Sequence, residues 1–556
     1  MQGLTMPGLM MPGLMMEVPL TVTLILRHAQ RNHPEQEVVS ITADHPRHRY
    51  TYGEAFARSA QLANALARLP LPPDARVATL AWNDFRHLEL FYAVACSGRI
   101  LHTVNPRLLP EQIAWIINDA GATILFAAPE FAPLLAKLTP YLRHVTTIVY
   151  MTGVAHMPAA LPAPLLAEAR CYEQLLAGEP RDFNWPDLDE RRASSLCYTS
   201  GTTGHPKGVL YSHRSTVLHA MAAAGADVMG VKAMDTVLPV VPMFHVNAWG
   251  IPFIVPMAGG KLVLPGRGAG DPATLVDLIN SERVTIALGV PTVWLALLQH
   301  LAATGARLPG LKRTVVGGAA CPQAVIDEFR DRHGVETHHA WGMSETSPLG
   351  TFNSPKPGQE QLSLAAARTL KAKQGRSVFG VEMRIVGDDG QELPRDGRTF
   401  GALQVRGPFV ASGYFRLEKS DAHTVDSWFD TGDVATIDPD GYMQITVRTK
   451  DVIKSGGEWI SSIELENHAV GHPAVAEAAV IGVAHPKWSE RPLLVVVLKP
   501  GETVTRDDLL AFLAAKVPSW WVPDDVIFVS EIPHTGTGKI NKIPLRDEYR
   551  DYLKQE

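Results

Sequence analysis

The sequence predicts an α/β protein, with a large N-terminal domain of α/β layers that includes a β-rich part and a small α+β domain at the C-terminus. Two long regions, residues 50–150 and 235–340, alternate helical patterns with short apolar runs, as βαβ units around a parallel sheet do. After about residue 380 the pattern changes to short strands with turn signals. A final segment from about residue 451 has its own alternation of strands and a helix.

The first α/β region contains candidates for both kinds of element. Helices are expected at residues 52–69 and 110–120, and buried strands at 76–81 and 123–127. The segment that follows, residues 153–190, is rich in Pro, Ala and acidic residues and is expected to run over the surface.

The later elements follow the same patterns. Buried strands of the second α/β region are expected at residues 237–241, 261–264, 285–288 and 313–316. In the β-rich part, DDG at 388–390 and DPDG at 438–441 predict turns. The final segment is expected to form strands at 478–483 and 493–498 and a helix at 506–516.

The composition is that of an ordinary globular protein. The chain has 556 residues, of which 46% are hydrophobic and 19% charged, and this length suggests about three or four structural units. A net charge of -6 provides no general attraction to nucleic acid or to an anionic membrane. We therefore expect no nucleic-acid partner, and any phosphate-binding site must be a local arrangement.

The cysteines and the N-terminus indicate a cytoplasmic protein. The four cysteines lie far apart without a CxxC pair, which argues against a disulfide framework and against zinc; they are Cys96, Cys171, Cys197 and Cys321. The Met-rich start has no Lys or Arg before Arg27 and is interrupted by Pro7 and Pro12, unlike a signal peptide. Its duplicated MPGLM makes Met6 or Met11 an alternative start. No run approaches the roughly 18 apolar residues of a membrane span.

The strongest local signal is YTSGTTGHPKG at residues 198–208. Its glycines let backbone N–H groups approach phosphate oxygens, its hydroxyls add donors, and Lys207 supplies a cation. The string therefore predicts a loop that wraps polyphosphate. The GxxxxGK[ST] loop of NTPases does not fit, because Pro206 precedes Lys207 and Gly208 follows it, so no hydroxyl is placed to hold magnesium.

This loop resembles the phosphate-binding signature of the adenylate-forming superfamily, which includes acyl-CoA synthetases, firefly luciferases and the adenylation domains of peptide synthetases. The other signatures of the superfamily follow in its order: VPMFHVNAW at 241–249, GGAA at 317–320, AWGMSET at 340–346, WFDTGD at 428–433, RTKDVIKSGGEW at 448–459 and TGTGKI at 535–540. Chance does not explain such an ordered set, and the resemblance spans nearly the whole chain after residue 20.

The resemblance implies a fold and a reaction. The implied architecture has an N-terminal AMP-binding domain of α/β and β-barrel parts over residues 1–447, a hinge at 448–454 and a mobile C-terminal domain at 455–556. The implied activity is that of an AMP-forming acyl-CoA synthetase. A carboxylate attacks the α-phosphorus of ATP and pyrophosphate leaves, and the thiol of coenzyme A then takes the acyl group from the adenylate. The family also implies Mg²⁺ and a homodimer.

The resemblance further implies roles for individual residues. Lys539 would serve the adenylation step, Glu345 and Thr199 would hold Mg²⁺, and His245 would contact the substrate carboxylate; these four form the expected catalytic set. The residues expected to bind the nucleotide or CoA are Thr199, Ser200, Gly201, Thr202, Thr203, Gly204, Lys207, Gly318, Ala319, His339, Ala340, Trp341, Gly342, Ser344, Thr346, Asp433, Arg448, Lys450, Lys454, Gly457 and Trp459. The acyl chain is expected against His245, Trp249, Gly317 and Ala320, with Trp249 as a gate.

Three of the nucleotide contacts have more specific expectations. Trp341 stands where the superfamily commonly has Tyr, and an indole in that position can stack on adenine. Asp433 resembles the residue that accepts hydrogen bonds from the ribose hydroxyls, while Lys450 resembles the position about which the small domain rotates.

The acid is expected to be a fatty acid. VPMFHVNAW and KSGGEWISS look most like strings of medium- and long-chain fatty acyl-CoA synthetases and of their methylthiopropionate-activating relatives. A short-chain or methylthiopropionate ligase is therefore an alternative, and a luciferase-like oxygenase shares every adenylation residue. A non-catalytic binding protein on this fold is disfavoured, because it would be expected to lack one of Lys207, Glu345, Asp433 and Lys539.

Overall fold

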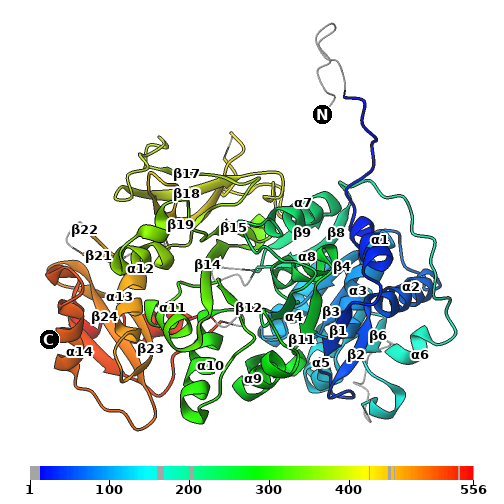
Figure 1. Ribbon diagram of the computed structural model, residues 1–556, viewed down its shortest axis with the longest axis horizontal. Helices are drawn as coiled ribbons and strands as arrows, with labels where there is room; N and C mark the ends of the chain where they lie inside the picture. The colour runs from blue at the N-terminus through cyan, green and yellow to red at the C-terminus, as the bar shows by residue number, and fades with distance from the viewer. Residues whose placement is uncertain are drawn as a thin grey trace, which may run out of the picture.

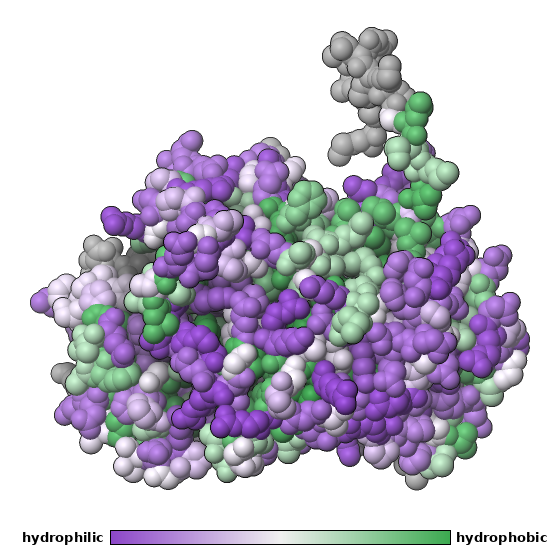
Figure 2. All heavy atoms as spheres, viewed as in Figure 1, coloured by the Kyte–Doolittle hydropathy of each residue, from purple (hydrophilic) through white to green (hydrophobic). Residues whose placement is uncertain are grey.

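The computed structural model describes residues 13–158, 168–199, 205–424, 426–448, 453–455, 458–535 and 539–554. Two large sheets with their helices and a smaller antiparallel sheet form the N-terminal part, and a separate small domain forms the C-terminal end (Figure 1). No helix in these ranges is long and apolar enough to cross a membrane. The segment before α1 (Val22–Asn32) projects from the body, and its Leu14, Met15 and Met16 side chains are exposed (Figure 2).

The first large sheet has seven strands in the order β7-β6-β5-β3-β4-β8-β9, parallel except for β9. Its strands are β3 (Arg76–Leu80), β4 (Ile100–Thr103), β5 (Ile124–Ala127), β6 (Thr147–Tyr150), β7 (Glu168–Cys171), β8 (Ala193–Tyr198) and β9 (Gly208–Ser212). The helices of this region are α2 (Tyr52–Ala67), α3 (Phe85–Cys96), α4 (Pro110–Ala120), α5 (Ala132–Leu138), α6 (Tyr172–Leu176) and α7 (His213–Ala223). The helices and strands expected here are confirmed, with α4 at its predicted bounds.

The expectation that residues 153–190 run only over the surface is wrong. β7 adds an edge strand to the sheet, and Tyr172 at the start of α6 is fully buried. Its hydroxyl donates to Glu89 over 2.7 Å, and Arg58 and Arg86 bind Glu173 next to it. The burial of this short helix depends on charged side chains from α2 and α3. The composition of residues 153–190 therefore did not predict the helix.

The second large sheet has nine strands in the order β16-β15-β14-β13-β12-β10-β11-β1-β2. Its strands are β1 (Glu37–Ser40), β2 (His48–Thr51), β10 (Thr236–Pro239), β11 (Lys261–Leu264), β12 (Ile286–Gly289), β13 (Arg313–Val316), β14 (Glu336–Gly342), β15 (Leu349–Phe352) and β16 (Arg376–Ser377). The helices are α8 (Ile251–Ala258), α9 (Pro272–Ser281), α10 (Pro291–Thr304), α11 (Gln323–Glu328) and α12 (Leu364–Ala372). The four strands expected here are confirmed to within two residues.

The β-rich part is a four-stranded antiparallel sheet of β17 (Glu382–Val386), β18 (Phe400–Arg406), β19 (Phe429–Ile437) and β20 (Met443–Arg448). Both predicted turns are present, with Gly390 and Gly441 at positive φ. A short joint ties this sheet to β15: Gly375 accepts from the amide of Met443 over 2.8 Å, and its Cα lies against the backbone of Phe352. The joint fixes where β19, which carries Asp433, stands relative to β14.

The C-terminal domain has a five-stranded sheet with a helical layer and its own core. Its strands are β21 (Ile453–Ser455), β22 (Glu458–Ile460), β23 (Val475–His485), β24 (Ser489–Leu498) and β25 (Asp525–Phe528), and its helices are α13 (Ser462–Val470), α14 (Arg506–Ala514) and α15 (Lys542–Tyr549). The strands and helix expected here are confirmed. Separate clusters of buried side chains lie within this domain. In Figure 1 it occupies one end of the molecule, in orange to red.

The joint at Gly375 generates a prediction about stability. Gly375 has φ of +97°, and a Cβ there would lie 2.1 Å from the carbonyl carbon of Phe352. Gly375→Ala should lower the free energy of unfolding in urea by about 3 kcal/mol, from backbone overpacking and left-handed strain together. Gly358→Ala is the control, because Gly358 also has positive φ but open space around it; it should cost about 1 kcal/mol. Equal losses would show that the joint is not tightly packed.

Candidate active site

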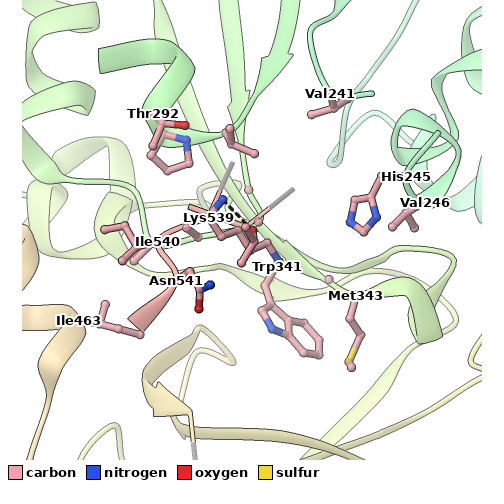
Figure 3. Close-up of a pocket in the computed structure, with 18 of the residues that line it drawn as sticks. Val241, His245, Val246, Thr292, Trp341, Met343, Ile463, Lys539, Ile540 and Asn541 are labelled. Carbon is pink, nitrogen blue, oxygen red and sulfur yellow. Dashed lines mark hydrogen bonds between the residues drawn. The ribbon is translucent and has the colours of Figure 1, made fainter. Parts of the chain in front are cut away.

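A cavity of about 470 Å³ lies between the N-terminal part and the small domain. Its walls come from the β8–β9 connection, the residues after β10, the starts of α10 and α11, the end of β14, and α13 with the segment around Lys539. In the close-up, Trp341 and His245 belong to the N-terminal wall, and Lys539, Ile540 and Asn541 approach from the C-terminal domain (Figure 3). Both domains thus contribute to one site.

The predicted phosphate loop is the connection between β8 and β9. At its base, the Thr199 amide donates to the Lys207 carbonyl over 2.9 Å, and the Lys207 amide donates to Thr199 Oγ1 over 3.2 Å. These bonds close the loop, and the side chains of Thr199 and Lys207 line the cavity. The predicted contacts Ser200, Gly201, Thr202, Thr203 and Gly204 lie outside the described residues. The structure therefore shows the base of the loop.

Tyr414 connects the loop cation to the predicted metal ligand. The Lys207 ammonium lies 4.9 Å from the Tyr414 ring centroid, and the Tyr414 hydroxyl donates to Glu345 Oε1 over 2.7 Å. Glu345 is buried in the short turn after β14, where its carbonyl accepts from the Ala411 amide. The sequence argument did not identify Tyr414, because no motif contains it and only the fold places it here.

The donor set around Glu345 fits a hard cation. The Glu345 carboxylate and the Thr199 hydroxyl both line the cavity, and carboxylate and hydroxyl oxygens are the ligands that Mg²⁺ prefers. Thr346 behaves differently, because it is fully buried and its hydroxyl bonds to the carbonyls of Met343 and Pro348. Its side chain is directed into the protein and does not line the cavity.

Trp341 and Asp433 form one unit. The indole N–H of Trp341 donates to Asp433 Oδ2 over 2.9 Å, and both side chains are more than nine-tenths buried. The ring lies against Gly350, where a Cβ would come within 2.4 Å of it. The expected adenine platform thus also orients the expected ribose acceptor. Asp433 stands opposite Arg448 in the β19–β20 register.

The other predicted nucleotide contacts differ in their placement. Gly318, Ala319, Ala340, Gly342 and Ser344 line the cavity. His339 is buried outside the cavity lining, with Nδ1 on the carbonyl of Ala372 at 3.0 Å. Lys450 and Gly457 lie outside the described residues. Of Arg448, Lys454 and Trp459, the structure describes only the backbone, at the end of β20 and in β21 and β22.

The part of the cavity beside Trp249, where the acyl chain is expected, is bounded by an unusual turn. Residues 246–250 all have positive φ, a left-handed conformation that costs non-glycine residues about 1–2 kcal/mol each. Asn247 stabilises the turn by donating to Ser195 Oγ on β8 over 3.2 Å. Trp249 leaves this turn to lie against Gly317, where a Cβ would be 3.0 Å from the ring. Asn247 was missed by the sequence argument, because its partners are distant in the chain.

His245 and Lys539 face each other from opposite domains. Burial lowers the pKa of His245 to about 3, and the positive charge of Lys539 contributes to this shift. His245 is therefore neutral at physiological pH and can offer a hydrogen bond without a charge. The Lys539 side chain passes Gly318, whose Cβ would lie 3.5 Å from the lysine Cε. Lys539 thus reaches the site as expected from its position in a C-terminal turn.

Comparison with known proteins gives a consistent result. The AMP-binding enzyme family matches residues 26–415, and its C-terminal domain family matches residues 464–539. The 3-methylmercaptopropionyl-CoA ligase of Ruegeria lacuscaerulensis is 52% identical, covering 97% of this chain and 99% of that protein. The medium-chain-fatty-acid–CoA ligase of Ectopseudomonas oleovorans is 49% identical over 97% of both chains. The long-chain-fatty-acid–CoA ligase of Thermus thermophilus is 44% identical over 97% of both.

Solved structures resemble the whole fold. An anthranilate CoA ligase in complex with anthranoyl-AMP superposes with a TM-score of 0.85 at 25% identity, covering 97% of this chain and 99% of the other. ATP-bound MatB from Rhodopseudomonas palustris superposes with a TM-score of 0.78 at 25% identity, covering 96% and 100%.

The Trp341–Asp433 hydrogen bond can be tested by removing only the indole N–H. Trp341→Phe retains an aromatic face but loses a bond to a buried carboxylate, so the Kd for ATP should rise about tenfold or more. Isothermal titration calorimetry measures it directly. Trp185→Phe is the control, because Trp185 packs against Phe183 and does not line the cavity; its Kd should not change. An unchanged Kd for Trp341→Phe would mean that stacking alone accounts for the role of Trp341.

Proposed function

The chain belongs to the AMP-binding enzyme family and is an AMP-forming acyl-CoA ligase, and we propose that its acid is an aliphatic, unbranched fatty acid. The choice of acid rests on the residues that line the cavity near Trp249. The two segments that carry Trp249 and its contact Gly317, residues 241–249 and 317–320, contribute no charged side chain to the cavity lining, since His245 is neutral. Such a wall favours an alkyl chain over an amino or dicarboxylic acid.

The arrangement of charges supports the adenylation step. A carboxylate and a triphosphate are both anionic, so their approach requires cations at the place where charge accumulates. Lys207 approaches from the phosphate loop and Lys539 from the C-terminal domain. The carboxylate would attack the α-phosphorus between them, with pyrophosphate as the leaving group. Neutral His245 would donate a hydrogen bond to the carboxylate without neutralising the nucleophile.

We propose that Glu345 and Thr199 hold Mg²⁺. When bound, the ion would supply positive charge to the phosphate oxygens. Tyr414 holds the Glu345 carboxylate in a fixed orientation, and Lys207 stays close to the same ring. These residues therefore keep the ligand and a second cation in place before ATP arrives.

A short-chain or methylthio acid is the second candidate. The Trp249 indole lies against Gly317, where it would limit the room for a long acyl chain, and the 3-methylmercaptopropionyl-CoA ligase of Ruegeria lacuscaerulensis is named for a small acid. The volume of the space that opens when the Trp249 indole moves would distinguish a fatty acid ligase from a short-chain or methylthio acid ligase. A homodimer and a cytoplasmic location remain part of the proposal; the four cysteines are all free and buried, as suits a reducing compartment.

The acid can be identified by measuring acyl-CoA formation with ATP, CoA and a series of straight-chain acids, together with methylthiopropionate. A fatty acid ligase should show its highest kcat/KM with a medium or long chain. A maximum at methylthiopropionate or at a short acid would replace the fatty acid proposal by the second candidate. Light emission with a luciferin and oxygen is the matching test for a luciferase-like activity, and we expect none.

Trp249 should control the acyl profile. Trp249→Ala should change KM and the preferred chain length for the acid, with little effect on KM for ATP, because the indole contacts Gly317 at the acyl end. Gly317→Ala should also change the acid profile, because the added Cβ would lie 3.0 Å from the indole and displace it. Gly310→Ala is the control, because a Cβ there meets only ordinary contacts beyond 3.7 Å. The gate role fails if both acyl-site variants keep the wild-type acid profile.

Lys539 should act in only one half-reaction. Lys539→Ala should slow acyl-adenylate formation about a hundredfold or more, because the variant loses a cation where charge develops. Conversion of supplied acyl-adenylate and CoA to acyl-CoA should stay near the wild-type rate. Lys516→Ala, an exposed lysine of the same domain, is the control. Single-turnover measurements of each step decide this, and equal losses in both steps would contradict the assignment.

A further inference from the structure

The segment that carries Lys539, called the lysine turn below, comprises residues 533–541, of which 536–538 lie outside the described residues. Its two arms pair with each other. The Thr535 amide donates to the Lys539 carbonyl over 2.7 Å, the Lys539 amide donates to Thr535 Oγ1 over 3.2 Å, and the Asn541 amide donates to the Pro533 carbonyl over 2.7 Å. These bonds join the described residues on the two sides of the turn to each other.

A charged pair attaches the lysine turn to the sheet. His534 Nε2 lies 2.6 Å from Glu477 Oε1 on β23. β23 has an irregularity in its register between Val475 and Glu477, and such bulges redirect side chains. Glu477 lines the same cavity as Lys539. The side chains of His534 and Glu477 are 33% and 20% exposed, so water screens the pair less than it screens a fully exposed one.

We propose that His534 is a positioning residue for Lys539: its ion pair with Glu477 holds the lysine turn on β23 so that Lys539 enters the cavity, and deprotonation of His534 weakens this hold. The inference rests on the proposed function, because it concerns the adenylation step. Misplacement of a reacting group by about 1 Å can cost about a hundredfold in rate. His534 lies five residues before Lys539. Loss of its ion pair can therefore displace the lysine and slow the reaction.

The pair also controls a charge inside the cavity. With His534 protonated, the Glu477 carboxylate is compensated; without the proton, it is an additional anion in a cavity that must accept polyphosphate. Other charged groups face this region: Glu531 from the approach to the turn, Glu466 from α13, and Lys542 and Arg546 from α15. Lys542 is already bound to Glu466 at 2.6 Å and to Ser462 at 2.9 Å. Its ammonium group therefore already has binding partners on α13.

The pair makes adenylation dependent on pH in a defined direction. Glu477, and to a lesser extent Glu531, raise the pKa of His534 above its ordinary value. The stabilisation from the pair is therefore fully present below the ordinary histidine pKa and is lost as pH rises through the raised one. Adenylation should decline on the alkaline side of neutrality. An arginine at residue 534 would keep its charge and remove this dependence.

The experiment compares the full-length wild type with His534→Gln, His534→Arg and Glu477→Gln. Single-turnover formation of acyl-adenylate is followed between about pH 6 and pH 9, where an imidazole titrates. At low pH, His534→Gln and Glu477→Gln should be about ten- to a hundredfold slower than the wild type, with conversion of supplied acyl-adenylate and CoA within about twofold. His534→Arg should recover most of the rate and flatten the pH profile.

A second measurement does not depend on activity. In histidine NMR titrations, the signal that is missing from His534→Gln should titrate above the ordinary range in the wild type and return to it in Glu477→Gln. The control is His485→Gln, at the other end of β23, where the carboxylate of Asp524 is 3.9 Å away; its adenylation profile should match the wild type.

The inference is overturned if His534→Gln adenylates at the wild-type rate, if both half-reactions fall equally, or if the histidine titrates normally. A wild type that forms no acyl-CoA from any acid would instead refute the proposed function. The NMR titration would still show in that case whether the pair exists.

Discussion

Repulsion between a carboxylate and a triphosphate is the constraint on which the rest of this site depends. Two anions must meet in a partly enclosed cavity, where their repulsion is stronger than in water. Two lysines line the cavity from independent parts of the chain, Lys207 from the N-terminal part and Lys539 from the small domain, and they are the cations that we propose offset this repulsion. The neighbouring imidazole of His245 remains neutral, because burial keeps its pKa at about 3.

The two large sheets provide the rigid support for these groups. β8 ends at Tyr198, immediately before the phosphate loop, and β14 ends at Gly342, three residues before Glu345. The left-handed turn that positions Trp249 follows β10 and is tied to β8 through Asn247. Loops at the ends of parallel strands can thus adopt strained conformations and hold functional residues, because the buried strands beneath them provide a fixed support.

The small domain contributes in a different way. It has its own core, and both polar and apolar residues of the lysine turn, α13 and α15 line the cavity, among them Glu466, Lys542, Ile463 and Ile540. The His534–Glu477 pair lies within the small domain together with Lys539, so any movement of the domain as a whole would carry both.

The sequence by itself determined the α/β class, most of the strands and helices, and the identity of the motif residues, because these follow from local patterns. α4 and the strands β11 and β13 have their predicted bounds, since apolar periodicity and flanking Pro or Gly residues act over a few positions. The short elements at residues 168–176 escaped prediction, because their burial depends on Arg58 and Arg86 from other helices.

Only the tertiary structure decided how the motif residues are held. Tyr414 between Lys207 and Glu345, Trp341 on Asp433, and His534 on Glu477 each join residues that are distant in the chain. No local pattern specifies such pairs, because the attraction exists only after the sheets have brought the partners within hydrogen-bonding distance. For the same reason the motif did not predict that Thr346 Oγ1 and His339 Nδ1, on two residues assigned by resemblance to the nucleotide, lie within hydrogen-bonding distance of backbone carbonyls.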